Sequence, residues 1–147
     1  MAAAAAIERM GITHLADTIY TQISGGERQL ALIARALAQE ARFVIMDEPT
    51  ANLDFGNQVR VLERIRTLAR EGIGVLLSTH DPDQVFLCAD RVAMLHGGSL
   101  VACGDTAAVM TTAQLQKIYG IPVSVTEVPL QEGGVSRKVC LPLGLLR

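Results

Sequence analysis

The sequence predicts an α/β protein with a mostly parallel sheet flanked by helices. Two short apolar, β-prone runs, at 42–47 and 73–79, have the character of buried strands. Between residues 42 and 90 these runs alternate with segments of helical periodicity, which implies right-handed crossovers between parallel strands. The length of 147 residues, half of them hydrophobic, is enough for one buried core.

The first part of the chain predicts two helices. Residues 2–10 are strong helix formers, and Gly11 closes them as a C-cap residue. A second helix should start after Ser24, because Ser24 and Glu27 have the spacing of a capping box, in which each side chain bonds the amide of the other residue. This helix continues to residue 39, and its apolar stripe comprises Leu30, Ile33, Ala34 and Leu37.

A strand, a helix and a second strand follow. The run 42–47 is typical of a strand that is buried on both faces of a parallel sheet. Asp54 is the predicted N-cap of the next helix, and Gly72 ends it. The run 73–79 is the second strand, and His80 comes directly after it. The side chains of the helix that should face the core are Val61, Leu62, Ile65, Leu68 and Ala69.

The last part of the chain contains several short elements. Asp81 and Pro82 restart a helix as its N-cap and its first residue. The glycine pair at 97–98 predicts a two-residue hairpin turn. The predicted elements are a helix to about residue 89, strands at 91–96 and 99–103, helices at 107–110 and 113–119 with Gly120 as the stop, and strands at 123–128 and 135–141.

Composition excludes several classes of protein. The net charge of −2, the lack of a long block of one sign and an aromatic content of 3% argue against nucleic-acid binding. The longest stretch without Asp, Glu, Lys or Arg, 92–104, is too short to span a bilayer, and the start of the chain lacks the basic segment of a signal peptide. Three cysteines without metal-ligand spacing favour a reducing, cytoplasmic setting.

The segment Ser24-Gly25-Gly26-Glu27 has two interpretations. In the first it is only the capped start of a helix. In the second it also binds a terminal phosphate, because two glycines leave the amides uncovered at the positive end of a helix and Ser24 adds a hydroxyl donor.

A second candidate site lies where the two predicted strands end. Asp47 and Glu48 follow the first strand, at the edge where α/β sheets usually bind ligands. Because two carboxylates are expensive to bury without a cation, they predict a magnesium site at Asp47, reached through water, and a general base at Glu48. His80 follows the second strand and can bond a phosphate oxygen or the catalytic carboxylate. The alternative is structural: the carboxylates cap the next turn, and His80 has no chemical role.

Four motifs in a fixed order resemble the ATPase domain of ATP-binding-cassette (ABC) transporters. ISGGE at 23–27 resembles the LSGGQ signature, and FVIMDE at 43–48 resembles the Walker B strand with its catalytic glutamate. ANLD at 51–54 resembles the D-loop, and the segment 78–80, Ser-Thr-His, resembles the switch histidine. The resemblance covers most of the chain. It implies a P-loop NTPase-like fold with a helical segment first and a β-hairpin and small α/β tail last.

The resemblance implies a role for each matching residue. Asp47 would serve Mg²⁺, Glu48 would polarise the attacking water, and His80 would hold the γ-phosphate end of ATP. Leu53 and Asp54 would communicate across a head-to-tail dimer of two ATPase subunits. The γ-phosphate of ATP held by the opposite subunit would be bound by the signature residues Ser24, Gly25, Gly26 and Glu27.

One departure from the family pattern points to a subgroup. Glu27 stands where the family usually has glutamine. This variant is typical of members that import iron-siderophores, haem, cobalamin and related metal chelates. The tail at 118–123 also resembles that subgroup.

The P-loop of the family, G-x-x-x-x-G-K-[ST], does not occur in the sequence. The two lysines, Lys117 and Lys138, follow Gln116 and Arg137. The adenine-stacking strand and the glutamine loop are missing too. We therefore expect a truncated ATPase domain that exposes apolar surface, so that the isolated chain dimerises, aggregates or needs a partner. Its expected parts are a helical subdomain with the signature at 1–40, a core sheet at 41–104 and a C-terminal tail at 105–147.

The resemblance supports one hypothesis about function and leaves two others open. In the first, the chain is an importer ATPase subunit on the cytoplasmic face of the membrane, and it couples Mg-ATP hydrolysis to transport of a metal chelate through a permease. In the second, it is a non-catalytic fragment that contributes only the signature half-site. A DNA-repair or chromosome-maintenance ATPase is the third, but it needs a coiled coil that the 22 residues before the signature cannot contain.

Overall fold

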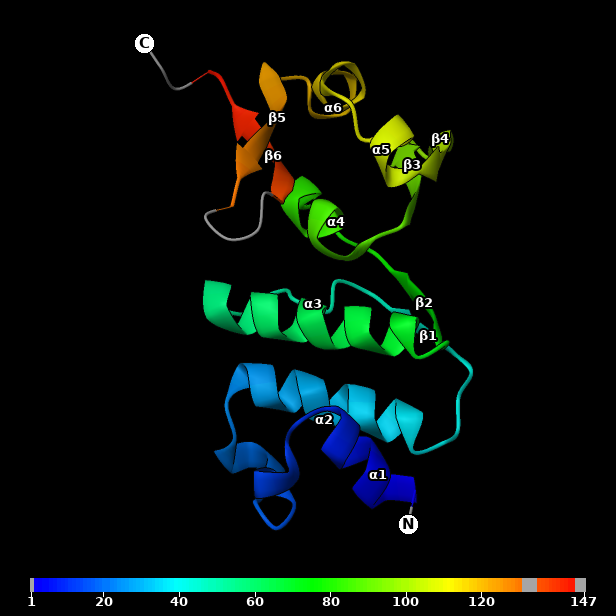
Figure 1. The fold of residues 1–147 in the computed structure, drawn as a ribbon, viewed down its shortest axis with the longest axis vertical. Helices are drawn as coiled ribbons and strands as arrows, with labels where there is room; N and C mark the ends of the chain where they lie inside the picture. Colours follow the sequence, from blue (N-terminus) through cyan, green and yellow to red (C-terminus); the bar gives the residue numbers. More distant parts are fainter. Residues whose placement is uncertain (1, 131–134, 145–147) are drawn as a thin grey trace. The chain divides into compact units, whose positions relative to one another are not determined.

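The computed structural model describes residues 2–130 and 135–144. The chain forms two compact units, Met1–His80 and Asp81–Arg147. Both units combine helices with strands, which confirms the predicted α/β class (Figure 1). The division into parts at 1–40, 41–104 and 105–147 stays a prediction.

Three helices form one side of the first unit. Helix α1 spans Ala2–Arg9, α2 spans Gly25–Leu37 and α3 spans Phe55–Arg70, and α2 lies between the other two (Figure 1). Two short 3-10 turns, η1 at Thr13–Leu15 and η2 at Tyr20–Gln22, lead from α1 to α2. Gly11, which closes α1, has a φ of 70°, a left-handed conformation that favours glycine.

The apolar stripes of the three helices meet in one core. The four predicted residues of α2 are all buried, and so are four of the five predicted residues of α3. Ala69 is the exception, because it lies on the exposed side of α3, so that prediction was wrong. The buried members of this core are Ala6, Met10, Ile12, Leu30, Ile33, Ala34, Leu37, Val44, Met46, Val61, Ile65 and Leu68.

A two-stranded parallel sheet packs on these helices. Strand β1 spans Phe43–Met46 and β2 spans Gly74–Leu77, with Met46 beside Leu77 in the register. Val44 and Met46 face the core, whereas Phe43 and Ile45 on the other face are 58% and 72% exposed. The prediction that this strand is buried on both faces was therefore wrong. Among the residues that the structure describes, helices cover one face of this sheet, and the other face carries exposed apolar side chains.

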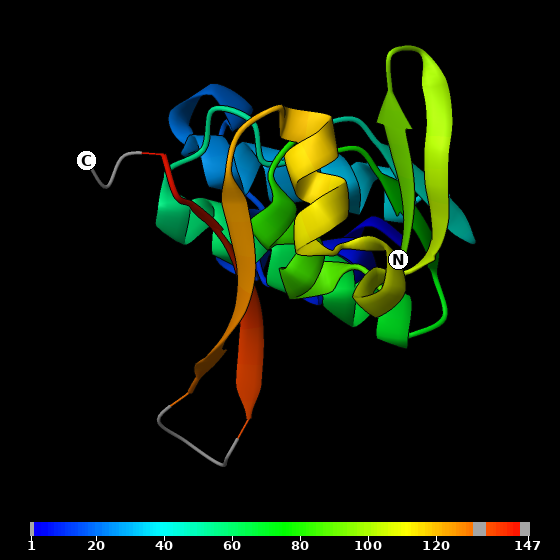
Figure 2. The ribbon, with the colours of Figure 1, turned by 90° about the horizontal axis from the view of Figure 1, so that it is seen from above.

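The described residues of the second unit form two antiparallel pairs of strands and three helices. Both pairs of strands can be followed in Figure 2. Helix α4 (Pro82–Cys88) begins as predicted, with Asp81 as N-cap and Pro82 in the first turn. The hairpin of β3 (Arg91–His96) and β4 (Ser99–Asp105) turns at the predicted glycine pair. The remaining elements are α5 (Thr106–Val109), α6 (Thr112–Tyr119), β5 (Val123–Pro129) and β6 (Ser136–Pro142).

A small core of its own holds the second unit together. Met94, Val109, Met110, Leu115 and Val123 are buried there. Burial raises the pKa of Tyr119 at the end of α6 and of the Cys140 thiol on β6. Within residues 2–130 and 135–144, no helix combines the length and the apolar character needed to cross a membrane.

Candidate functional site

The start of helix α2 forms the predicted capping box. The Ser24 hydroxyl accepts a hydrogen bond from the Glu27 amide at 3.3 Å, and the Glu27 carboxylate accepts one from the Ser24 amide at 2.8 Å. Hydrogen bonding to Ser24 lowers the pKa of the Glu27 carboxyl below its ordinary value. In the first turn of a helix, the amides lack partners within the helix. The amides of Gly25 and Gly26 therefore remain available to an anion at this helix end.

The segment 51–54 leads into helix α3 and touches the start of α2. Asp54 is the N-cap of α3, as predicted, and its carboxylate accepts bonds from the amide of Asn57 at 2.9 Å and from its side chain at 2.6 Å. These bonds lower the pKa of Asp54. A Cβ atom added to Gly25 would lie 3.3 Å from the Leu53 side chain. The two helix starts are thus packed against each other.

The parallel register brings the second group of predicted residues together at one edge of the sheet. Asp47 and Glu48 follow β1, and His80 follows β2. Nδ1 of His80 lies 3.1 Å from Oε1 of Glu48, and both side chains are solvent-accessible, at 81% and 46% exposure. Glu48 has a φ of 41°. A carboxylate beside an imidazole, both open to solvent, can take a proton from a water molecule placed between them and a phosphate.

Ser78 links the Asp47 carboxylate to the backbone of Glu48. Its hydroxyl donates a hydrogen bond to Asp47 Oδ1 and accepts one from the Glu48 amide at 2.9 Å. The exposed Asp47 carboxylate beside a hydroxyl fits Mg²⁺, which typically keeps several waters and takes one or two carboxylates plus phosphate oxygens from a nucleotide. Among the described residues, no group of three His, Cys, Asp or Glu side chains forms a cage for a metal ion. Such a cage is not needed for this mode of binding.

The first unit also contains a groove with a volume of about 640 Å³ between the segment 10–14, α2 and α3. Gly26, Glu27 and Asn57 are among its lining residues, together with four arginines of α3, Arg60, Arg64, Arg66 and Arg70. Asp47, Glu48 and His80 do not line it. The predicted residues therefore form two groups, one where α2 and α3 begin and one at the edge of the sheet.

Two residues of the site were not predicted from the sequence. Ser78 was quoted within a motif but given no role, although parallel pairing of two strands that end at 47 and 78 would have placed it beside Asp47. Asn57 was not singled out. The signal for Asn57 was its spacing of three residues after the N-cap Asp54, the same spacing that marks Ser24 and Glu27.

The chain is similar to ATP-binding proteins of transporters. A family model described as ABC transporter matches residues 1–51. An ABC transporter ATP-binding protein of Haemophilus influenzae is 47% identical over 114 residues, which cover 78% of this chain and 43% of that protein. The hemin import ATP-binding protein HmuV of Bordetella pertussis is 40% identical over 137 residues, which cover 87% of this chain and 52% of that protein.

Solved structures agree with these similarities. A metal-chelate type ABC transporter in an inward-facing conformation matches with a TM-score of 0.88 and 32% identity, over 97% of this chain and 56% of that one. The ATP-binding cassette MJ1267 in its ADP conformation matches with a TM-score of 0.73 and 26% identity, over 80% of this chain and 47% of that one. The chain thus spans about half the length of the relatives that it matches.

Proposed function

The chain belongs to the ATP-binding domain family of ABC transporters, and on that premise we propose that it carries the signature, Walker B, D-loop and switch-histidine part of an importer ATPase. One observation carries this proposal. His80 lies 3.1 Å from Glu48 at the edge of the sheet where Asp47 is bonded to Ser78, and this arrangement supports a site for hydrolysis of a phosphoanhydride.

Glu48 acts as the general base in this proposal. Its carboxylate accepts a proton from the attacking water, while His80, 3.1 Å away, orients the carboxylate and bonds the γ-phosphate. Asp47, oriented by the Ser78 hydroxyl, holds Mg²⁺ through water. When bound, the magnesium ion neutralises charge on the phosphates. Hydrolysis of ATP then yields ADP and inorganic phosphate, with water as the nucleophile.

The signature residues act on a second nucleotide. Ser24, Gly25 and Gly26 present a hydroxyl and two amides at the positive end of α2, and this arrangement suits the γ-phosphate of ATP held by another subunit. Glu27 keeps the helix end in place through the capping box. Leu53 and Asp54, which lie beside this helix end, are the residues that would sense the opposite site in a head-to-tail dimer.

We further propose that the assembled protein works with a membrane permease at the cytoplasmic face of the membrane and imports a metal chelate. The support is the hemin import and the metal-chelate transport for which two relatives are named, together with Glu27 in the signature. ATP is the substrate, and Mg²⁺ is the expected cofactor.

The test uses a full-length domain in which the chain replaces the matching 114 residues of the Haemophilus influenzae relative. We expect Mg-ATP hydrolysis by this chimera, and a loss of about 100-fold or more in kcat for Glu48→Gln because the base is removed. The Glu48→Gln variant should also accumulate as an ATP-bound dimer on size-exclusion chromatography. Glu8→Gln, the same change at an exposed position of α1, is the matched control. Equal turnover in both variants would refute the role of Glu48.

A second candidate function is a non-catalytic chain that supplies only the signature half-site to a partner. This function is considered because these 147 residues contain no Gly-Lys pair and hence no P-loop, so that a P-loop would have to come from another segment or another chain. Titration of the chain alone with ATP separates the two functions. Micromolar binding of ATP would contradict the half-site function, and no binding would favour it.

A further inference from the structure

We infer that Asn57 is a positioning residue that fixes the phosphate-facing start of α2 to the D-loop within one subunit. This inference rests on the proposed function, because only there do the signature and the D-loop act on a nucleotide. It assigns a role to a residue outside the four motifs and explains why Gly26 is required where it stands.

The first contact of Asn57 is with the D-loop. Both nitrogen donors of Asn57 bond the Asp54 carboxylate, the amide to Oδ1 at 2.9 Å and the side chain to Oδ2 at 2.6 Å. The Asn57 side-chain oxygen in turn accepts a weaker bond from Arg60 at 3.4 Å, one turn further along α3. Asp54 is therefore held by two donors, and the amide of the Asn57 side chain has a fixed orientation.

The second contact of Asn57 is with the signature. A Cβ atom on Gly26 would lie 2.6 Å from Cγ and Oδ1 of Asn57 and 2.8 Å from its Cβ. These distances are shorter than a van der Waals contact, so the Asn57 side chain rests directly on the backbone of Gly26, which is buried. Glycine at 26 thus has a packing reason in addition to the position of its amide in the first turn of α2.

The two contacts together make one rigid connection. Asn57 touches Gly26 and Asp54, and Leu53 approaches Gly25, so consecutive residues of the signature are matched with residues on either side of Asp54. A displacement of α2 by a bound phosphate would therefore be passed to the Asp54 carboxylate. The side chain that transmits it has two rotatable bonds and is held at both ends.

The experiment uses the full-length chimera in the Glu48→Gln background, in which the ATP-bound dimer is stable enough to measure. We expect Asn57→Ala to raise the ATP concentration needed for half-maximal dimerisation by about tenfold, because two donors to a charged carboxylate are reduced to one. Affinity of the monomer for ATP, measured with a fluorescent nucleotide, should not change. This split separates positioning from a general loss of structure, which would weaken both.

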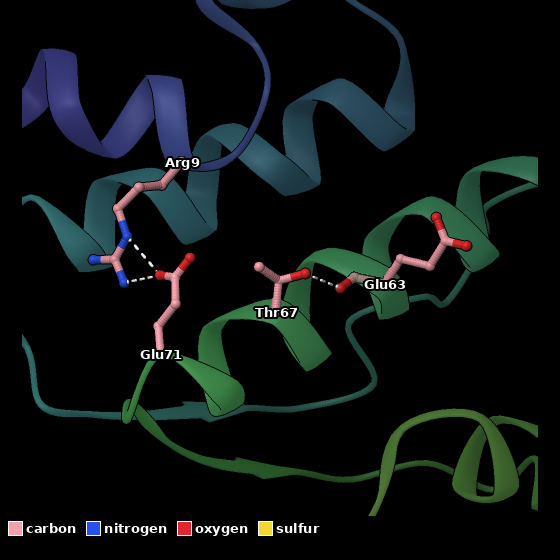
Figure 3. Close-up of polar contacts among 4 residues, drawn as sticks. All are labelled: Arg9, Glu63, Thr67 and Glu71. Carbon is pink, nitrogen blue, oxygen red and sulfur yellow. Dashed lines mark hydrogen bonds and ion pairs between the residues drawn. The ribbon is translucent and has the colours of Figure 1, made fainter.

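Thr67→Val is the matched control, because Thr67 lies on the same helix, is exposed, and its hydroxyl donates a hydrogen bond to the Glu63 carbonyl of its own helix (Figure 3). Hydrogen exchange of the Asn57→Ala chimera provides a second measurement, with faster exchange expected in the first turns of α2 and α3 and no change in α1. Unchanged dimerisation by Asn57→Ala, or a parallel loss of monomer affinity, overturns the inference. If the parent Glu48→Gln chimera forms no ATP-dependent dimer, the proposed function fails, and the inference with it.

Discussion

The helix side and the open sheet face of the first unit differ in how deeply their apolar side chains are buried. On the helix side, the apolar side chains of α1, α2 and α3 meet in a core whose members are at most 9% exposed. On the open face of the sheet, Phe43, Ile45 and Leu76 are 58%, 72% and 53% exposed. The signature and the D-loop thus stand on packed helices, whereas Asp47, Glu48 and His80 end strands that are covered on one face.

This difference means that the two groups of site residues are held by different packing. The signature and the D-loop rest on a buried helical core, whereas Asp47, Glu48 and His80 follow strands with one exposed face. Full burial of a large apolar side chain is worth about 1.5–3 kcal/mol, and the three side chains on the open face gain only part of it within this chain. On the helix side, the signature is held by a buried core that the three helices form within this chain. We expect the sheet edge to gain stability from any apolar layer that covers the open face.

The largest expected change in the free energy of unfolding comes from a substitution in the buried core. Leu68, 1% exposed on α3, and Leu76, 53% exposed on β2, permit the same substitution on the two sides. Leu68→Ala should lower the free energy of unfolding by about 2–5 kcal/mol, because it leaves a cavity. Leu76→Ala should cost about 1 kcal/mol or less. Urea denaturation followed by circular dichroism measures both, and equal losses would break the comparison.

A smaller effect is expected at the start of α2. Ser24→Ala removes the hydroxyl that accepts the Glu27 amide, and loss of such an N-cap costs about 1 kcal/mol of stability. Thermal unfolding measures the change, with Ser99→Ala in the exposed β3–β4 hairpin as the control. A loss no greater than that of the control would mean that the capping box does not support the signature.

A still smaller contribution to stability is expected from the ion pair between the end of α1 and the C-terminal end of α3. The Arg9 guanidinium donates two hydrogen bonds to one carboxylate oxygen of Glu71, one of them at 3.0 Å (Figure 3). Because both side chains are partly exposed, their coupling energy should be about 0.2–1 kcal/mol and should fall with added salt. A double-mutant cycle of Arg9→Ala and Glu71→Ala measures it. A coupling that is insensitive to salt would contradict an exposed ion pair.

The last prediction concerns pH. The pKa of Glu27 is lowered from its ordinary 4.5 in the folded chain, so its stabilising effect is complete above that value and is lost as pH falls through the folded pKa. Wild type should therefore be more stable than Glu27→Gln at about pH 7, and this difference should shrink toward about pH 3. Chemical denaturation across this range measures it. A constant difference would show that the Glu27 charge does not matter.

The helices and turns could be predicted because their signals are local. Ser24, Asp54 and Asp81 each cap a helix as expected, and the glycine pair at 97–98 makes the hairpin turn. The three side chains at the sheet edge could be predicted to meet because parallel strands bring their carboxyl ends together. The roles of these residues came from the motifs and stay proposals.

The remaining features depend on neighbours that are distant in the sequence. The exposure of Phe43 and Ile45 follows from what lies against the second face of the sheet, and the apolar run 42–47 carries no information on this. Asn57 is important because α2 and α3 approach closely at Gly26, and this contact spans 31 residues of sequence. Ala69 was placed in the core because periodicity fixes a stripe but not its edges.

The backbone conformation of Glu48 has a consequence for evolution. A φ of 41° is a left-handed conformation that a residue with a side chain occupies at a cost of about 1–2 kcal/mol, whereas glycine occupies it freely. Glu48→Gly should therefore make the chain more stable while it removes the carboxylate that contacts His80 and is proposed as the base. Selection for stability and selection for turnover would then favour different residues at this one position.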